Sequence, residues 1–272
     1  MPVQQLAWRA IEKVWGRRDF PASYGTASDF ADPVGEIWFE DAGASELLIK
    51  RLFTSERLSI QVHPSDEQAR ASGHARGKDE AWFVLTAEPG ATIGAGFAAA
   101  LTADELRAAA LDGSIETLLT WHEVKPGDFF YVPAGTVHAI GAGLSLLEIQ
   151  QNIDLTYRLF DYGRPRALQL AEGIAASVAQ PYVHRPIARI GASREVLAAG
   201  PKFVVERLSG STQHDLPASP AAPVWLMPIS PGCTVDGMGI APGMVWLADG
   251  PAQVRLGADD CLLIAYAGEK AY

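Results

Sequence analysis

Polar and apolar residues alternate from Leu58 to Pro64, the most informative stretch of the chain. Side chains on a strand point alternately to its two faces, so the apolar residues share one face and Ser59, Gln61 and His63 share the other. Polar side chains on an inner face are costly unless a partner satisfies them, and a metal ion with a polar ligand is such a partner. The pattern therefore predicts a strand, ended by Pro64, that brings polar groups to a site.

Most other periodic segments of the first half also indicate short strands. Glu80 lies on one of them, with Lys78 and Trp82 on the same face. Another runs through Pro133 to His138. The expected strands include residues 35–39, 46–52, 77–85, 129–132 and 145–151.

Helical spacing occurs in fewer places. At the N-terminus, Leu6, Ile11 and Val14 lie on one face of a short helix. The clearest helix spans residues 102–119, where Thr102 and Glu105 form a capping box. A capped turn at residues 65–70 and a further helix over residues 167–179 complete the expected set.

The second half of the chain consists of short strands interrupted by Pro and Gly, a texture typical of a β-sandwich or barrel. Its two histidines, His184 and His214, do not lie on strands with a polar face. We therefore expect two domains. Residues 1–180 form a metal-binding catalytic domain with an N-terminal helix and a short helical insertion, and residues 181–272 form a degenerate second β-barrel without a metal site.

Composition narrows the class of protein. The chain has 272 residues and a net charge of −10, which argues against nucleic acid as a partner because phosphate backbones need a basic footprint. No apolar run is long enough for a membrane span, and no signal peptide is visible at the N-terminus. Cys233 and Cys261 have no metal-site spacing and indicate reduced thiols, hence a cytoplasmic protein. We expect a monomer or a homodimer.

The polar strand residues suggest a metal site. Gln61 and His63 come from one strand, Glu80 from the next, and His138 follows a Pro-Ala-Gly turn. Two imidazoles, a carboxylate and an amide oxygen suit one Zn²⁺ per chain, with a position left open for water or substrate. The alternative is that both histidines are ordinary half-buried residues and that Glu80 is solvated.

Four ordered motifs carry a resemblance to a known family. Residues 58–64, 77–82, 126–140 and 148–158 resemble type I mannose-6-phosphate isomerase in its short bacterial form, a member of the cupin superfamily, and the likeness covers about residues 10–166. It implies a mainly β fold, a double cupin of jelly-roll β-barrels with a few peripheral helices. It also implies a zinc-dependent aldose–ketose isomerase that interconverts mannose 6-phosphate and fructose 6-phosphate through an enediol or enediolate.

The resemblance assigns roles position by position. Gln61, His63, Glu80 and His138 match the family's zinc ligands. Ser59 and Lys78 match residues that line the sugar-phosphate pocket. Arg158 matches an arginine beside the reacting carbons, and Asp154, placed one helical turn earlier, matches an acidic site residue.

The expected catalytic residues are Arg158, Lys78 and Asp154, with Ser59, Lys78 and Arg158 binding a sugar phosphate. A fixed guanidinium suits the developing anion because it stays protonated, and Lys78 and Ser59 can donate to the phosphate. The sequence does not single out the base that transfers the proton, and the alternatives are Asp154, Glu148 and a metal-bound water.

Several structural alternatives also stand. Arg158 could merely pair with Asp154, Lys78 could be a solvated edge lysine, and Glu148 could be a structural acceptor. Arg164 and Arg166 are expected to make surface contacts. The alternative functions are a cupin isomerase for another sugar or sugar phosphate and a non-catalytic sugar-binding cupin.

Overall fold

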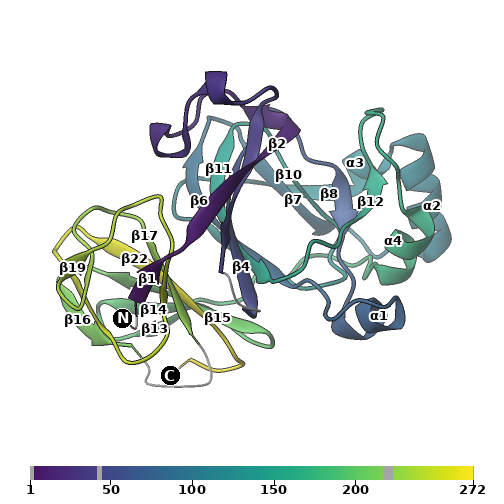
Figure 1. Ribbon diagram of the computed structural model, residues 1–272. Coiled ribbons are helices and arrows are strands. Elements are labelled where there is room, and N and C mark those ends of the chain that lie inside the picture. Colours follow the sequence, from purple (N-terminus) through teal and green to yellow (C-terminus); the bar gives the residue numbers. More distant parts are fainter. Residues whose placement is uncertain (1–2, 42–44, 217–222, 272) are drawn as a thin grey trace. The chain divides into compact units, whose positions relative to one another are not determined.

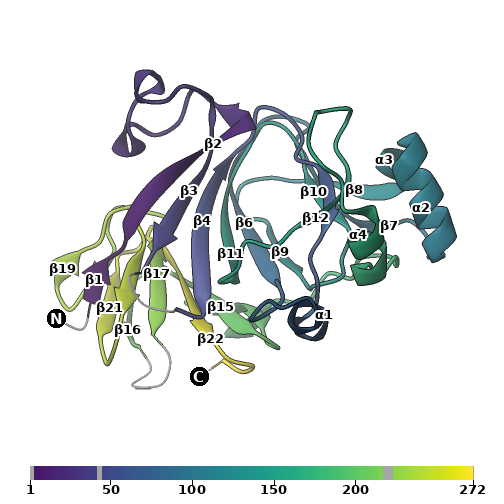
Figure 2. The same cartoon turned by 45° about the vertical axis from the view of Figure 1, so that its right-hand side comes forward.

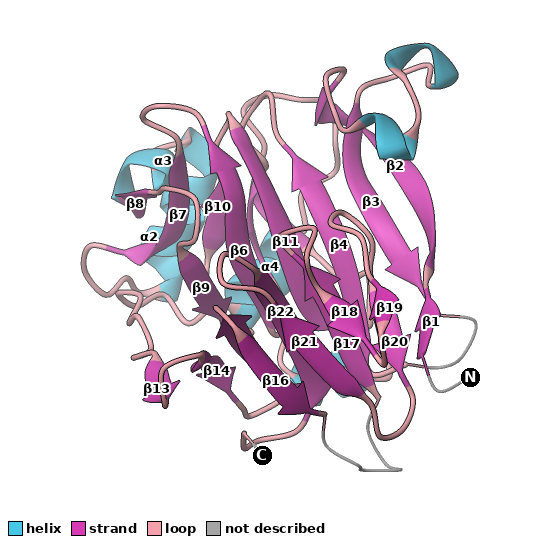
Figure 3. Ribbon diagram, turned by 90° about the vertical axis from the view of Figure 1, so that its left-hand side faces the viewer, coloured by secondary structure: helices cyan, strands magenta, loops and turns pink. Residues whose placement is uncertain are grey.

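The computed structural model describes residues 3–41, 45–216 and 223–271 and is built mainly from antiparallel strands (Figures 1 and 3). Contacts within the chain group it into two units. The first comprises Ala10–Trp38 and Leu48–His184, and the second comprises the described residues within Met1–Arg9, Phe39–Leu47 and Arg185–Tyr272. The expected mainly β fold with few helices is confirmed, and the functional division at residue 180 stays a prediction.

The first unit contains two antiparallel sheets, which Figure 2 shows from the side of the helices. One has the strand order β2 (Ala7–Arg17), β3 (Val34–Glu40), β4 (Leu47–Phe53), β11 (Leu144–Gln151), β6 (Glu80–Ala87) and β9 (Phe129–Val132). The other has the order β12 (Tyr157–Phe160), β5 (Ile60–Val62), β10 (His138–Ile140), β7 (Thr92–Phe97) and β8 (Leu119–Glu123).

The predicted alternation on β5 is what orients that strand. Ile60 and Val62 are fully buried and pack in one apolar cluster with Leu106 and Ile174 from the helices. Burying a side chain of this size stabilises the fold by about 1.5–3 kcal/mol. Because alternate residues face opposite ways, anchoring these two apolar side chains under the helices turns Gln61 toward the other face.

The helices are short and lie beside the five-stranded sheet (Figure 1). Thr102 and Glu105 form the predicted capping box, in which the hydroxyl accepts the Glu105 N–H at 3.2 Å and the carboxylate accepts the Thr102 N–H at 2.8 Å. The helix ends at Gly113, whose φ of 84° suits glycine. The α-helices are α1 (Asp66–Ala71), α2 (Ala103–Asp112), α3 (Ile115–Leu118) and α4 (Leu170–Ala176), and 3₁₀ turns occupy Ala22–Tyr24 and Ala27–Asp29.

None of the helices within the described ranges is long and apolar enough to cross a membrane.

The predicted N-terminal helix is wrong. Residues 3–5 form β1 (Val3–Gln5) and the following residues form β2. The segment is rich in Trp, Ile and Val, which fit a pleated surface, and pairing with β3 supplies its backbone hydrogen bonds. The residues expected on one helical face do not share a buried face in the fold, because Leu6 is buried whereas Val14 is 59% exposed.

The second unit also has two sheets around one apolar core. The larger sheet has the order β1, β20 (Trp246–Ala248), β17 (Val224–Pro228), β22 (Cys261–Ala267), β15 (Phe203–Ser209), β14 (Arg194–Ala199) and β13 (Ala188–Ile190). The smaller has the order β16 (Thr212–Asp215), β21 (Gln253–Leu256), β18 (Thr234–Val235) and β19 (Met238–Gly239). Among the residues described here, no group of three possible metal ligands converges in this unit.

A buried carboxylate ties three neighbouring strands of the larger sheet together. Glu206 on β15 is fully buried and accepts hydrogen bonds from the guanidinium of Arg194 on β14 and from the hydroxyl of Tyr266 on β22. The Arg194 Nη2 atom lies 2.9 Å from Glu206 Oε1. Both partners engage the charge, so removing the carboxylate takes a buried counter-charge from Arg194 and an acceptor from Tyr266.

We therefore expect Glu206→Ala to lower the free energy of unfolding by about 3–5 kcal/mol. Glu40→Ala is the matched control, because it removes a solvent-exposed ion pair with Arg9 and is expected to cost at most about 1 kcal/mol. Urea unfolding followed by circular dichroism measures both. Equal losses in the two variants would contradict a structural role for the buried carboxylate.

Candidate functional site

One row of polar side chains crosses the five-stranded sheet of the first unit. Gln61 on β5 lies directly opposite His138 on β10 and Arg158 on β12. Directly opposed residues in an antiparallel pair project from the same face. The strand register therefore places an imidazole, an amide and a guanidinium side by side.

A second row crosses the six-stranded sheet. On β11, Glu148 lies opposite Trp82 of β6, and Gln150 lies opposite Glu80. The Trp82 Nε1–H donates to Glu148 Oε2 at 3.1 Å, which confirms that these side chains share a face. Lys78 precedes β6 and shares this face with Glu80, as predicted.

Three possible metal ligands meet between the two sheets. The ligand atoms of His63, Glu80 and His138 all lie within 4.8 Å of one another. His63 Nε2 is 3.3 Å from Glu80 Oε2, and His138 Nε2 is 3.1 Å from Glu80 Oε1. All three residues are 1% exposed, so the alternative of a solvated Glu80 and half-buried histidines does not describe this site.

Backbone carbonyls fix the orientation of both imidazoles. His63 Nδ1 donates to the Leu155 carbonyl at 2.9 Å, and His138 Nδ1 donates to the Thr136 carbonyl at 2.8 Å. A carbonyl only accepts, so each Nδ1 carries the proton and each Nε2 keeps its lone pair toward Glu80. This outer contact is the usual way in which proteins orient metal-binding histidines.

The donor set fits a metal ion of the zinc type. Among the described residues, His63 Nε2 and Glu80 Oε1 are buried without a hydrogen-bond partner, as expected of atoms that serve as ligands, while Glu80 Oε2 lies 2.9 Å from Lys78 Nζ. Gln61 is placed beside them, with its Nε2 3.3 Å from His138 Nε2 and its Oε1 accepting from the Ser59 hydroxyl at 3.0 Å. To act as a ligand, Gln61 must turn its amide so that the oxygen faces the cluster.

Electrostatics keep these groups in their ligand forms. Burial lowers the pKa of His138 to about 4 and also lowers the pKa of His63, so both imidazoles are neutral near pH 7. Burial alone would raise the pKa of Glu80, but the ammonium group of Lys78 holds it well below its usual range. The cluster therefore combines two neutral nitrogen donors with one carboxylate.

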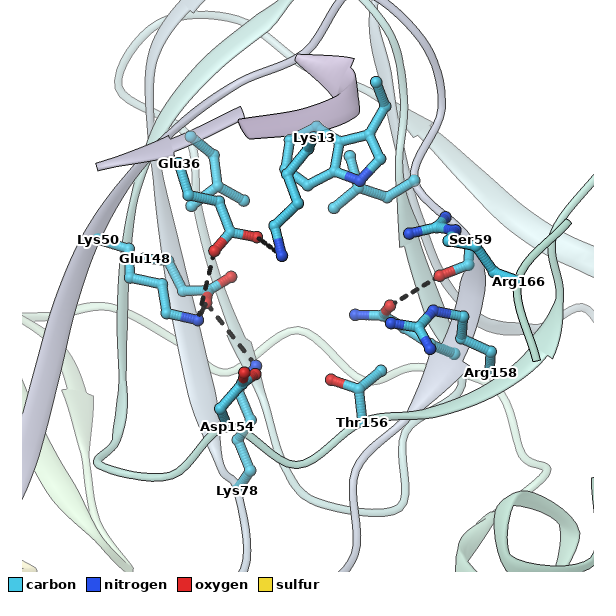
Figure 4. A pocket seen from close by; sticks show the side chains of 14 residues that line it. Lys13, Glu36, Lys50, Ser59, Lys78, Glu148, Asp154, Thr156, Arg158 and Arg166 are labelled. Carbon is cyan, nitrogen blue, oxygen red and sulfur yellow. Dashed lines mark hydrogen bonds and ion pairs between the residues drawn. The ribbon is translucent and has the colours of Figure 1, made fainter. Parts of the chain in front are cut away.

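A pocket opens beside the cluster (Figure 4). Side chains of both sheets and of the loop before β12 line it, so its walls come from segments far apart in the sequence. The lining residues are Lys13, Trp15, Glu36, Lys50, Leu52, Leu58, Ser59, Gln61, Lys78, Glu148, Asp154, Thr156, Arg158 and Arg166.

One wall carries charges of alternating sign. Lys50 Nζ lies 3.3 Å from Glu148 and 3.9 Å from Glu36, and Lys13 Nζ lies 3.5 Å from Glu36. Lys78 Nζ lies 2.9 Å from Glu80 and 3.7 Å from Glu148. Burial alone would lower the pKa of Lys78, but the two carboxylates raise it. The ammonium groups of this wall are thus compensated within the protein.

The opposite wall carries two guanidinium groups and a hydroxyl. Arg158 Nε is buried without a hydrogen-bond partner among the described residues, and burial together with Arg166 lowers the pKa of Arg158. Arg166 is held by Asp161, which accepts from its Nε and Nη2 at 2.6 Å each. Ser59 lies on the same side of the pocket (Figure 4).

The structure brings all the predicted site residues together. Gln61, His63, Glu80 and His138 surround one point, and Ser59, Lys78, Asp154 and Arg158 line the adjoining pocket. Their roles stay predictions.

Two expectations about their surroundings are wrong. Arg158 lies on β12 and Asp154 in the loop before it, so no helical turn joins them. Arg166 lines the pocket rather than the outer surface, because Asp161 holds it there.

Sequence reasoning missed the other wall of the pocket, formed by Lys13, Glu36 and Lys50. Glu36 and Lys50 stand inside otherwise apolar strands and are almost fully buried, a signal that was visible in the sequence. Lys13 carried no such signal, because the N-terminal segment was expected to be helical.

Comparisons with known proteins agree with this arrangement. No model of a protein family matches the chain. The mannose-6-phosphate isomerase of Streptococcus mutans is 40% identical over 178 residues, which are 61% of this chain and 56% of that protein. The chain therefore spans about half the length of this curated relative.

Two solved structures share the fold over nearly the whole chain. The mannose 6-phosphate isomerase from Bacillus subtilis has a TM-score of 0.81 at 24% identity, and the alignment covers 96% of this chain and 98% of that one. A zinc-bound mannose 6-phosphate isomerase has a TM-score of 0.74 at 16% identity, with 98% and 100% covered. The double cupin fold is confirmed, and so is the resemblance of this chain to mannose-6-phosphate isomerases.

Proposed function

We propose that the protein is a zinc-dependent aldose–ketose isomerase that interconverts mannose 6-phosphate and fructose 6-phosphate. The observation that carries the proposal is the buried cluster of His63, Glu80 and His138 beside a pocket with a cationic wall. The curated relative named mannose-6-phosphate isomerase and the zinc-bound structural neighbour support it. A carboxylate and two imidazoles with a position left open are typical of catalytic zinc sites.

Three residues and an amide would hold the metal. His63, Glu80 and His138 supply nitrogen and oxygen donors, and Gln61 supplies its amide oxygen after turning. When bound, Zn²⁺ supplies a Lewis acid that stabilises negative charge on the sugar oxygens. One ion per chain follows from the single cluster among the described residues.

The phosphate of the substrate fits the arginine side of the pocket. Lys78 lies between two carboxylates, and Glu148 would repel a dianion placed beside it. On the opposite side, the hydroxyl of Ser59 and the guanidinium group of Arg166 line the pocket, and the carboxylate that pairs with Arg166, Asp161, is not part of the lining. We therefore assign phosphate binding to this side, with Lys78 donating to an oxygen of the sugar chain.

Arg158 and Asp154 would act on the reacting carbons. Arg158 lies directly opposite Gln61 in the sheet, so its guanidinium is next to the metal cluster and can stabilise a developing enediolate. Asp154 faces the pocket from the loop before β12 and would move the proton between C1 and C2. Glu148 is already engaged by the Trp82 indole and two ammonium groups, which favours Asp154 as the base.

The first prediction concerns the metal. The unaltered protein should bind one Zn²⁺ per chain, and His63→Ala should weaken binding by more than about 100-fold, because losing a ligand costs more than the 10- to 100-fold lost with an outer contact. Competition with a chromophoric chelator measures the affinity. His74→Ala, which removes an exposed histidine of the same unit, should leave it unchanged. Equal affinities of the two variants would place the metal elsewhere.

The second prediction concerns the reaction. A coupled assay for fructose 6-phosphate formed from mannose 6-phosphate should show activity that is lost on chelation and restored by Zn²⁺. The assay tests the reaction class and the cofactor together, because the proposed reaction needs a Lewis acid to stabilise negative charge on the substrate oxygens. Folded, zinc-loaded protein that does not turn over mannose 6-phosphate would overturn the proposal, and a panel of other aldoses would then identify the substrate.

The third prediction concerns Arg158. Arg158→Lys keeps the charge but loses the planar set of donors, so kcat/KM should fall on the order of 100-fold while zinc affinity stays within threefold. Arg57→Lys is the control, because Arg57 is solvent-exposed and lies outside the pocket lining. A loss of less than twofold at Arg158 would remove this residue from the proposed machinery.

A further inference from the structure

Gln150 is the most deeply buried amide at the site, and none of the roles above includes it. The residue is fully buried on β11, directly opposite the candidate ligand Glu80 on β6. It also shares a strand face with Glu148, which lines the pocket. A buried amide in this place needs partners for two N–H groups and one oxygen.

The amide hydrogens of Gln150 bond the last residue of its own strand and the segment that follows. Gln150 Nε2 donates to the carbonyl of Gln151 at 3.0 Å and to the carbonyl of Ile153 at 2.7 Å. These two bonds clamp the chain where it leaves β11 and enters the loop 152–156. The loop therefore starts from a fixed geometry set by one side chain.

That loop supplies three groups to the site. The carbonyl of Leu155 accepts the Nδ1–H of His63 at 2.9 Å and so orients a candidate metal ligand. Asp154 and Thr156 line the pocket from the same loop. A shift of the loop would move the acidic side chain and the carbonyl together.

We propose that Gln150 is a positioning residue, which holds the loop 152–156 so that the Leu155 carbonyl orients His63 and the Asp154 carboxylate faces the pocket. The role of Asp154 rests on the proposed function, whereas the clamp and its effect on His63 do not. With the amide hydrogens engaged by Gln151 and Ile153, the amide oxygen is left buried without a partner among the described residues. A carboxylate of the same shape could not replace this amide, because it has no hydrogen to donate and would lie opposite Glu80.

The experiment compares Gln150→Met and Gln150→Glu with the control Gln213→Met in the full-length protein. Gln213 is an exposed glutamine on β16 of the other unit. Gln150→Met keeps the volume and removes both clamp bonds, so zinc affinity in chelator competition should fall about 10- to 100-fold. Amide hydrogen exchange of residues 152–156 should accelerate by about tenfold or more, with the central amides of β6 unchanged.

Gln150→Met separates a clamp from simple packing, because it fills the same volume without N–H donors and should be harmless if the side chain only fills space. Gln150→Glu also loses the donors and adds a buried charge opposite Glu80, so it should lower zinc affinity further. In the coupled assay, kcat should fall more than KM changes, because the groups displaced act on the reacting end. If Gln150→Met does not fold, Gln150→Asn takes its place, since it is too short to reach Ile153.

Two results would overturn the inference. One is zinc affinity within threefold of the unaltered protein together with unchanged exchange in residues 152–156. The other is an equal effect of Gln213→Met. If the unaltered protein does not turn over mannose 6-phosphate, the proposed function fails, and exchange and zinc affinity still decide the clamp.

Discussion

The carboxylate of Glu80 is the constraint on which the site depends. It is 1% exposed, and an ionised group taken this far out of water is several kcal/mol too costly unless charges of opposite sign surround it. Lys78 at 2.9 Å provides part of that compensation, whereas the two neutral imidazoles turn their Nε2 lone pairs toward the carboxylate and provide none. A bound cation would complete it. The arrangement explains why the unpartnered atoms of the cluster face one another rather than solvent.

Compensation of this charge extends across the whole sheet. The ammonium group of Lys78, next to Glu80, itself needs carboxylate partners. Charges of alternating sign therefore continue to the sheet edge through Lys78, Glu148, Lys50, Glu36 and Lys13. Most of these side chains come from different strands, so strand order and register decide which charges meet. A slip of one residue in any strand would turn its charge to the opposite face. The network therefore specifies the register as well as the chemistry.

The sequence predicted the local part of this arrangement well. The alternation around Gln61 predicted the polar face correctly, because the flanking apolar residues Ile60 and Val62 are buried against the helices. The capping box at Thr102 was equally readable, since it involves only residues three apart.

The rest of the site depends on contacts that no short window contains. β3 is buried on both faces, so its pattern does not say which way Glu36 points. The N-terminal segment looked helical because its apolar spacing was read without the neighbouring strand that pairs with it. The clamp made by Gln150 depends on the path of a loop, which side-chain periodicity does not describe.

The two walls of the pocket differ in how their charges are engaged, and this difference bears on what the pocket can recognise. On the six-stranded sheet, Lys50 and Lys78 each lie between two carboxylates, so that wall is close to neutral and offers fixed donors and acceptors in alternation. Hydroxyl groups, which both donate and accept, are complementary to such a surface. On the other wall, Arg158 Nε has no hydrogen-bond partner among the described residues, and the guanidinium attracts an anion. A molecule with a hydroxyl-rich body and one anionic end is complementary to both walls. An uncharged sugar would make no ion pair with the guanidinium, and an anion without hydroxyl groups would make no hydrogen bonds with the lysines and carboxylates of the other wall.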